Sequence, residues 1–203
     1  MPFDAIRRRA IPAAAAFAAA ALLAVPTAAS AEEAAPAGCP DIPTTQAFAA
    51  WGDLSDYFMA PGGDVEDGAD TWSLSGGAAA VEGNEPFGAG SRSLLLPAGG
   101  SATTAAMCVG VEHRSMRFFA RGPSSGVLRV EAVYEKRTSK EKAVHVATVS
   151  TSSDWAPTDV LPMIVNEHAG DYGNALPVAL RFSAVGTGSW QIDDVLVDPY
   201  RTG

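Results

Sequence analysis

The sequence is poor in basic residues, in cysteine and in helical periodicity. Its 203 residues include 14 Lys or Arg against 23 Asp or Glu, a formal net charge of -9 at pH 7. A surface of this charge repels nucleic-acid phosphates, so we expect no nucleic-acid partner. Apolar residues make up 47% and charged residues 18% of the chain, a composition that excludes a disordered chain and fits one folded domain.

No apolar run reaches the roughly 20 residues that a helix needs to cross a bilayer. The clearest run, Ile11 to Val25, lies between Arg7–Arg9 and the small residues Ala29-Ser30-Ala31. Positive, apolar and small residues in this order are typical of a secretory signal peptide. We therefore expect residues 1–31 to be a signal peptide cleaved after Ala31. We expect the mature chain to be secreted (extracellular), without a transmembrane segment.

Cysteine is limited to two residues, Cys39 and Cys108, both beyond the expected cleavage site. An even pair in an oxidising compartment most often forms one disulfide bond. This bond would tie an N-terminal lead-in, residues 32–52, to the main domain, residues 53–203. A metal site or a reactive thiol is the alternative, although no cluster of His or Cys accompanies either residue.

Helical periodicity is nearly absent, and residues 45–51 are the best helix candidate. Short β-prone runs separated by Gly, Pro, Asn, Ser and Asp clusters follow at a spacing of about 8–12 residues, which predicts a β-sandwich or barrel. Three of these runs alternate in the way of antiparallel strands with one buried face. The expected strands are residues 56–59, 71–75, 78–82, 92–97, 103–112, 115–121, 126–135, 143–151, 159–165, 177–185 and 189–197.

Several motifs, taken in order, resemble the galactose-binding-like jelly-roll domains, which include many bacterial carbohydrate-binding modules. Gly63 to Gly68 followed by Trp72 resembles their first strand. Ser91–Leu96 and Met116–Arg121 resemble two central strands, and Trp190–Val197 resembles the closing "I-D-D-V" strand. The chain is also similar to secreted bacterial proteins of unknown function. The resemblance covers about residues 53–198 and implies an all-β jelly-roll β-sandwich of two antiparallel sheets.

The resemblance also implies a structural metal. Such jelly rolls commonly hold a calcium ion between the first strand and the terminal Asp. Calcium takes about six to eight oxygen ligands, and carboxylates on neighbouring strands supply them. We therefore expect a structural Ca²⁺ held by Asp64, Glu66 and Asp193. The alternative is a solvated acidic loop together with an aspartate that caps backbone amides.

Outward-facing residues of three runs predict a glycan-binding surface. Carbohydrate sites combine aromatic rings with groups that bond hydroxyls, such as Arg, amides and carboxylates. If the three strands adjoin, their polar faces offer this combination, with Trp51, Tyr57, Trp155 and Tyr172 available at a rim. The alternative is ordinary cross-strand Arg–Glu pairing. The candidate ligand-binding residues are Arg117, Phe119, Arg121, Arg129, Glu131, Arg181 and Trp155.

No motif favours catalysis. Asn84-Glu85-Pro86 matches a tripeptide of barrel glycosidases, but a barrel needs roughly 250 residues and a turn explains the segment. His113, His145 and His168 are scattered and lack metal-ligand spacing. We therefore predict a secreted, non-catalytic protein that binds a carbohydrate or cell-wall glycan. The alternatives are a structural or adhesion protein that contacts other proteins, and a small secreted hydrolase.

Overall fold

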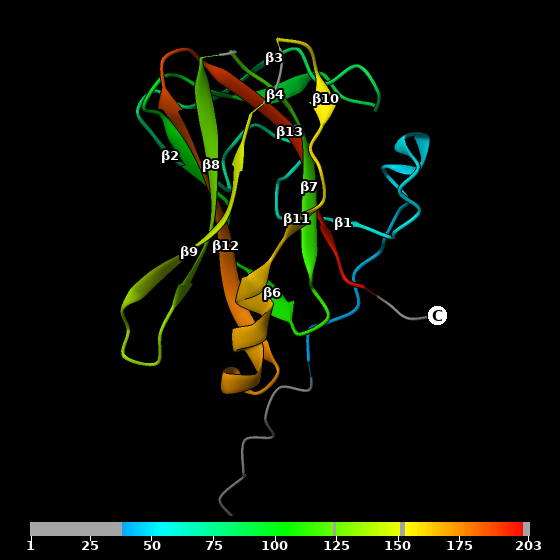
Figure 1. Ribbon diagram of the computed structural model, residues 1–203, viewed down its shortest axis with the longest axis vertical. Helices are drawn as coiled ribbons and strands as arrows, with labels where there is room; N and C mark the ends of the chain where they lie inside the picture. The colour runs from blue at the N-terminus through cyan, green and yellow to red at the C-terminus, as the bar shows by residue number, and fades with distance from the viewer. Residues whose placement is uncertain (1–37, 124, 151–152, 201–203) are drawn as a thin grey trace, which may run out of the picture. The chain divides into compact units, whose positions relative to one another are not determined.

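The computed structural model describes residues 38–123, 125–150 and 153–200, all within one compact unit, Ala34–Gly203. The predicted signal peptide, residues 1–31, lies outside the described residues. Within the described ranges, no helix is long and apolar enough to span a membrane. Regular structure there is almost entirely β, with two 3-10 helices, η1 (Ala49–Trp51) and η2 (Ile164–Tyr172) (Figure 1).

Thirteen strands are assigned among the described residues. They are β1 (Phe58–Met59), β2 (Ser73–Ser75), β3 (Ala79–Glu82), β4 (Arg92–Leu96), β5 (Ser101–Thr103), β6 (Met107–Gly110), β7 (Ser115–Arg121), β8 (Gly126–Glu135), β9 (Glu141–Val149), β10 (Ala156–Pro157), β11 (Leu161–Pro162), β12 (Ala175–Gly186) and β13 (Trp190–Asp198).

The strands form two antiparallel sheets, which confirms the predicted jelly-roll sandwich. The first sheet has the order β10-β7-β13-β4-β3, with β1 paired to β13 and β11 paired to β7. The second has the order β2-β5-β12-β8-β9, with β6 paired to β12. Most neighbours in each sheet come from distant parts of the chain, although β3 pairs with β4 and β8 with β9. The first and last strands pair through Phe58 and Val197.

Alternating side chains from both sheets fill the core between them. Phe118 of β7 meets Phe182 of β12 edge to face, with ring centroids 5.2 Å apart. Trp72 and Trp190 are buried in the same cluster, as expected for core tryptophans. Burial of each large apolar side chain contributes about 1.5–3 kcal/mol to stability, so this layer accounts for the cohesion of the sandwich.

A disulfide joins Cys39 to Cys108 of β6, which confirms the predicted bond. Three local expectations differ from the structure. The run 103–112 divides into β5 and β6, because Thr104 exchanges hydrogen bonds with Leu180 between them. The run 159–165 ends early in η2, whose buried Val165 and Ala169 lie four residues apart. In place of the helix expected at residues 45–51, the structure has only the single 3-10 turn η1.

Candidate functional site

A segment that precedes β1 covers part of the outer face of the first sheet. We call residues 45–57 the strap; it leads into β1 (cyan in Figure 1). Its two ends are joined by paired backbone hydrogen bonds of 2.8 Å between Thr45 and Tyr57. Phe48 and Tyr57 pack with Phe119 of β7 and Leu196 of β13 in a second apolar cluster. The strap thus builds a small core outside the sandwich.

A partly buried ion pair fixes the strap to β7. Arg117 Nη1 lies 2.7 Å from Asp53 Oδ2, and the Tyr57 hydroxyl donates to the same oxygen at 2.7 Å. Burial alone would raise the pKa of Asp53, but hydrogen bonds from Tyr57, Arg117 and Ser55 outweigh it and lower this pKa to about 2. The remaining Arg117 donors reach Thr158 O at 2.9 and 2.6 Å. Arg117 therefore holds the strap and is not presented to a ligand.

The predicted binding residues do not share one surface, because only two of their three strands adjoin. β7 lies in the first sheet, whereas β8 and β12 pair with each other in the second. Phe119 of β7 is buried beneath the strap, while Arg129 of β8 is exposed. The candidates divide into Arg117, Phe119 and Arg121 on one sheet and Arg129, Glu131 and Arg181 on the other.

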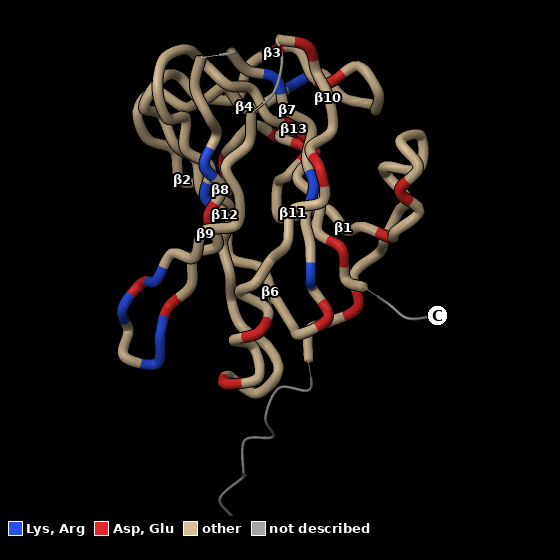
Figure 2. The backbone as a smooth tube through the Cα atoms, viewed as in Figure 1, with Lys and Arg blue, Asp and Glu red and all other residues tan. Residues whose placement is uncertain are grey.

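Cross-strand charges occupy the outer face of the second sheet. Arg181 lies opposite Glu131 in the β12–β8 register, and Arg181 Nη2 lies 2.7 Å from Glu141 Oε1. The charges continue into the β8–β9 hairpin, which carries all three lysines of the chain (Figure 2). This face has the features of the alternative interpretation, ordinary pairing on a sheet surface.

Two exposed aromatic rings, one on the strap and one on the loop before β4, lie over the first sheet. Trp51 is 39% and Phe87 50% exposed, and their ring centroids lie 5.0 Å apart. Both rings rest against Phe119, at 5.4 and 5.5 Å. Sequence reasoning missed Phe87, although an aromatic residue in the Gly-rich loop after Pro86 is a recognisable signal for an exposed ring. The strap and this loop thus place two rings side by side over β7.

A polar group continues this surface at the end of β7. Arg121 Nε donates to the side-chain oxygen of Gln191 on β13, and its guanidinium lies 5.1 Å from the Trp155 ring centroid. A hollow of about 350 Å³ opens here. Leu95, Arg121, Gly122, Pro123, Ser153, Ser189 and Gln191 line it. We call Trp51, Phe87, Arg121, Trp155 and Gln191 together the aromatic end.

Carboxylates gather at a bulge in β13. The register shifts between Asp193 and Leu196, and Asp194 has a positive φ of 45°. Asp193 and Glu85 are buried, and Asp193 accepts the Glu85 and Asp194 backbone N–H groups at 3.1 and 2.9 Å. Burial raises the pKa of Asp193 to about 7, and the charge of Asp194 adds to the rise. The two hydrogen bonds lower this pKa but do not offset the burial. The Asp193 carboxyl group therefore keeps its proton to a pH well above the ordinary range of an aspartate.

The same cluster surrounds Asp194. Burial raises its pKa to about 6, and the charges of Glu85, Asp64 and Glu66 add to the rise. A Cβ on Gly88 would lie 2.5 Å from Glu85 Oε1 and 3.5 Å from Asp194 Oδ2, so both oxygens lie around one point that the glycine leaves open. Sequence reasoning missed Glu85, which it assigned to a turn.

The three predicted calcium ligands are not assembled as one cage. Glu66 already accepts the N–H groups of Ser91 and Arg92 at 2.7 and 2.8 Å, which lowers its pKa. Both oxygens of Asp193 accept backbone N–H groups, and Asp64 is exposed. Among the described residues, no three of these carboxylates bring oxygens within 4.8 Å of one another. Glu85 Oε1 and Asp194 Oδ2 are instead the two carboxylate oxygens that face the open position beside Gly88.

Solved carbohydrate-binding modules have the same architecture. A xylan-binding domain of CBM22 aligns with 74% of this chain and 99% of its own, at a TM-score of 0.50 and 15% identity. The CBM22-2 xylan-binding domain of Paenibacillus barcinonensis Xyn10C aligns with 70% of this chain and 98% of its own. The TM-score is 0.50 and the sequence identity is 18%. The chain has the fold of a carbohydrate-binding module. No protein-family profile and no curated protein matches its sequence.

One further structure places this fold beside a catalytic module. The N-terminal CBM22-1–GH10 modules of Clostridium thermocellum endo-1,4-beta-D-xylanase 10B, complexed with xylohexaose, match 66% of this chain at a TM-score of 0.51 and 17% identity. The chain spans only 27% of that protein. At sequence identities this low, the structural alignments establish a shared fold and nothing more. Any function must be argued from the side chains of this protein.

Proposed function

We propose that the protein binds a carbohydrate through the aromatic end of the first sheet. The observation that carries the proposal is a pair of exposed rings, Trp51 and Phe87, that pack on Phe119 of β7, two residues before Arg121. Arg121 bonds Gln191, and both residues line an open hollow. Sugar C–H faces stack on aromatic rings, and guanidinium and amide groups bond hydroxyls. The xylan-binding modules of the same fold support a glycan as the class of ligand.

The site is proposed to bind without catalysis. A glycosidase places two carboxyl groups about 5–10 Å apart on either side of the bond to be cleaved. The residues that line the hollow, within the described part of the chain, include no Asp or Glu. The nearby Glu85 and Asp193 are buried, and the Glu85 carboxylate accepts the Phe87 N–H. These carboxyl groups serve the loop that positions Phe87.

Calcium is proposed to bind the acidic cluster beside this site. Glu85 and Asp194 would supply ligands, and Asp64 adds negative charge close by. A divalent cation would offset the repulsion that raises the pKa of Asp194. It would also stiffen the loop that carries Phe87. The protein is further proposed to act outside the cell after cleavage of residues 1–31, on the basis of the signal-peptide pattern.

Affinity for insoluble polysaccharides and purified cell wall tests the binding proposal. Protein retained on one polymer should be displaced by the soluble oligosaccharide of that polymer. Arg121→Ala should weaken binding at least tenfold, about 1.4 kcal/mol, with little change in the thermal midpoint. Arg129→Ala is the matched control on the second sheet and should bind like the unaltered protein.

Three outcomes of this experiment have distinct meanings. Loss of binding in Arg129→Ala but not in Arg121→Ala would place the site on the second sheet. Equal weakening in Phe87→Ala and Arg121→Ala would support a single surface at the aromatic end. Retention on no polymer, with folded protein and Ca²⁺ present, would overturn carbohydrate binding.

A further inference from the structure

Positive charge is concentrated in the hairpin between β8 and β9. Residues 136–142 contain all three lysines of the chain and Arg137, together with one acidic residue, Glu141. The chain as a whole has a formal net charge of -9 at pH 7. β9 is an edge strand of the second sheet, and Figure 2 shows the basic loop of the hairpin projecting away from the sandwich. The hairpin is therefore a local region of positive charge on an acidic protein.

Carboxylates of the protein do not neutralise this charge. The Glu141 carboxylate is paired with Arg181 of β12 at 2.7 Å. Among the residues that the structure describes, no carboxylate forms an ion pair with Lys136, Arg137 or Lys140, and all three are exposed. At an ionic strength of about 0.1 M, exposed charges interact over about 10 Å. A ligand at the hairpin therefore responds to these cations rather than to the net charge of the whole chain.

A hollow of about 420 Å³ opens between the hairpin and η2. Its volume lies in the range of sites that bind small ligands, roughly 300–1,000 Å³. Arg137 spans its two sides, because Arg137 Nη2 donates to the backbone oxygen of Asp171 and the guanidinium lies 5.4 Å from the Tyr172 ring centroid. The hairpin and η2 thus form one site. Its lining includes Tyr134, Lys136, Arg137, His168, Asp171 and Tyr172.

Three rings lie together at this hollow. The Tyr134 ring is buried, and its centroid lies 5.8 Å from that of His168 and 6.2 Å from that of Tyr172. His168 and Tyr172 are half-buried, so part of each ring remains open to a ligand. The hollow therefore combines aromatic surface with cations.

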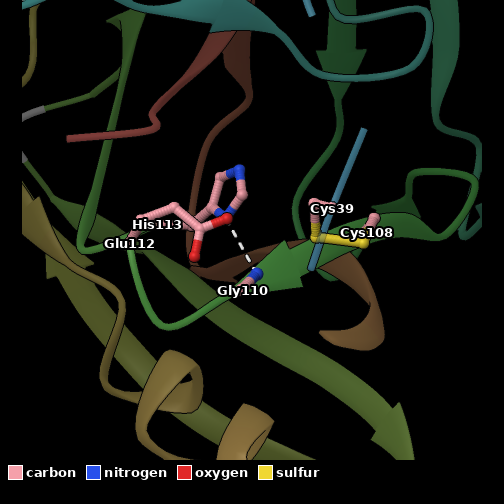
Figure 3. The surroundings of a disulfide bond; sticks show 5 residues. All are labelled: Cys39, Cys108, Gly110, Glu112 and His113. Carbon is pink, nitrogen blue, oxygen red and sulfur yellow. Dashed lines mark hydrogen bonds and ion pairs between the residues drawn. A yellow bond between two sulfur atoms is a disulfide. The ribbon is translucent and has the colours of Figure 1, made fainter. Parts of the chain in front are cut away.

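The protein holds η2 in place before any ligand binds. η2 packs against β6, β9 and β12, and its Val165 and Ala169 belong to the main core. The disulfide from Cys39 to Cys108 ties the lead-in to β6, one of these supports (Figure 3). A site that is already ordered loses little conformational entropy on binding.

We propose that this hollow is a second binding site, for an acidic polysaccharide whose sugars carry carboxylate groups. Lys136 and Arg137 bind the sugar carboxylate through charge-assisted hydrogen bonds. The rings of His168 and Tyr172 contact the C–H face of the sugar, and the Asp171 carboxylate accepts its hydroxyl groups. The site lies at the second sheet and does not depend on the sugar binding proposed for the aromatic end of the first.

The surroundings of the hollow favour a polymer strand over an anionic membrane. Glu135 of β8 and Glu167 of η2 are exposed on the two elements that flank the hollow. A broad anionic surface would approach these carboxylates together with the cations, and like charges repel. A single polysaccharide strand is narrow enough to contact the hollow alone.

Affinity for soluble polygalacturonate, measured by titration calorimetry in the presence of a chelator, tests the proposal. The fully methyl-esterified polymer is the matched ligand, because it has the same sugar backbone without the negative charges. The protein should bind the charged polymer at least tenfold more tightly than the ester. This binding should weaken as the salt concentration rises from about 0.05 M to about 0.5 M. Equal affinity for the two polymers would overturn the proposal.

Variants separate the hollow from general attraction to positive charge. Lys136→Gln should weaken binding of polygalacturonate at least threefold, and Arg137→Gln at least tenfold because it also unties the hairpin from η2. Arg129→Gln removes the same charge near the other end of β8 and should bind like the unaltered protein. Tyr172→Leu keeps the charge and should still weaken binding, with circular dichroism reporting the fold. Equal losses in Lys136→Gln and Arg129→Gln would overturn the site.

Two further measurements distinguish this site from other modes of binding. Arg121→Ala, which tests the aromatic end, should leave the affinity for polygalacturonate unchanged, so that the two sites succeed or fail independently. A loss of polygalacturonate binding in Arg121→Ala but not in Lys136→Gln would overturn the second site. Binding to phosphatidylglycerol vesicles without binding to polygalacturonate would also overturn it and would point to a membrane instead.

Discussion

The outer faces of β7 and β8 carry similar outward-pointing residues in different surroundings. On β7, Arg117 and Phe119 are buried because the strap packs over them. On β8, Arg129 is exposed and Glu131 half-buried. The covered face gains stability from the strap and positions the aromatic end, whereas the open face has ordinary cross-strand charges. Whether a distant segment covers a sheet face therefore decides the role of the residues that point outward from that face.

Removal of the ring at the centre of the covered face is expected to have the largest effect. Phe119→Ala should lower the free energy of unfolding by about 3 kcal/mol, because it removes the ring of β7 on which the strap packs and leaves a cavity. Arg129→Ala, at an outward position of β8, should change it by less than about 0.5 kcal/mol. Urea midpoints at constant m-value measure both. Similar losses for the two variants would remove the contrast between the faces.

Calcium bound at the acidic cluster of the first sheet is expected to stabilise the folded domain. At about 100 times its dissociation constant, a bound ion adds about 2.7 kcal/mol to the free energy of unfolding. The thermal midpoint at neutral pH should therefore rise with Ca²⁺ and fall with a chelator. Asp194→Asn should reduce this rise, and Glu131→Gln should preserve it. Identical midpoints with calcium and with chelator would rule out the site.

Without calcium, the buried carboxyl groups of the first sheet should make stability depend on pH. The pKa values of Asp193 and Asp194, about 7 and about 6, lie above the ordinary value. Between about pH 4 and about pH 7 the folded state holds protons that the unfolded state has released, so stability falls as pH rises. Asp194→Asn should remove on the order of 1 kcal/mol of this fall, after allowance for solvent screening.

Chemical unfolding in chelator at several pH values measures this dependence. Glu131→Gln on the second sheet serves as the control and should follow the unaltered protein. If Asp194→Asn leaves the pH profile of stability unchanged, the acidic cluster is not the cause of the pH dependence.

Local sequence signals predicted much of the fold. Alternation located β7, β8 and β12 to within a few residues, because it reflects one buried face along each strand. The two cysteines predicted their bond, and the resemblance of Trp190–Val197 to a closing strand predicted a sandwich with β13 inside it. The polar candidates of β7 and β8 were also outward-facing, as the alternation required.

The arrangement of the site was beyond such signals. Strand order depends on pairings far apart in the sequence, so alternation did not reveal that β7 and β8 lie in different sheets. Nor does a local pattern show that Phe48 would cover Phe119, or that Glu85 would be buried beside Asp193. Trp51 and Phe87 pack on Phe119 because the strap and the Gly-rich loop bring them to β7.

The strap has a consequence for the order of folding. Residues 45–57 are made early, yet they rest on β7 and on Leu196 of β13, near the end of the chain. Contacts of such long sequence separation form late, because the intervening chain must first close. The strap cannot take its native place before the last strand exists. Until β13 has been synthesised, Phe48 and Tyr57 lack their contact with Leu196.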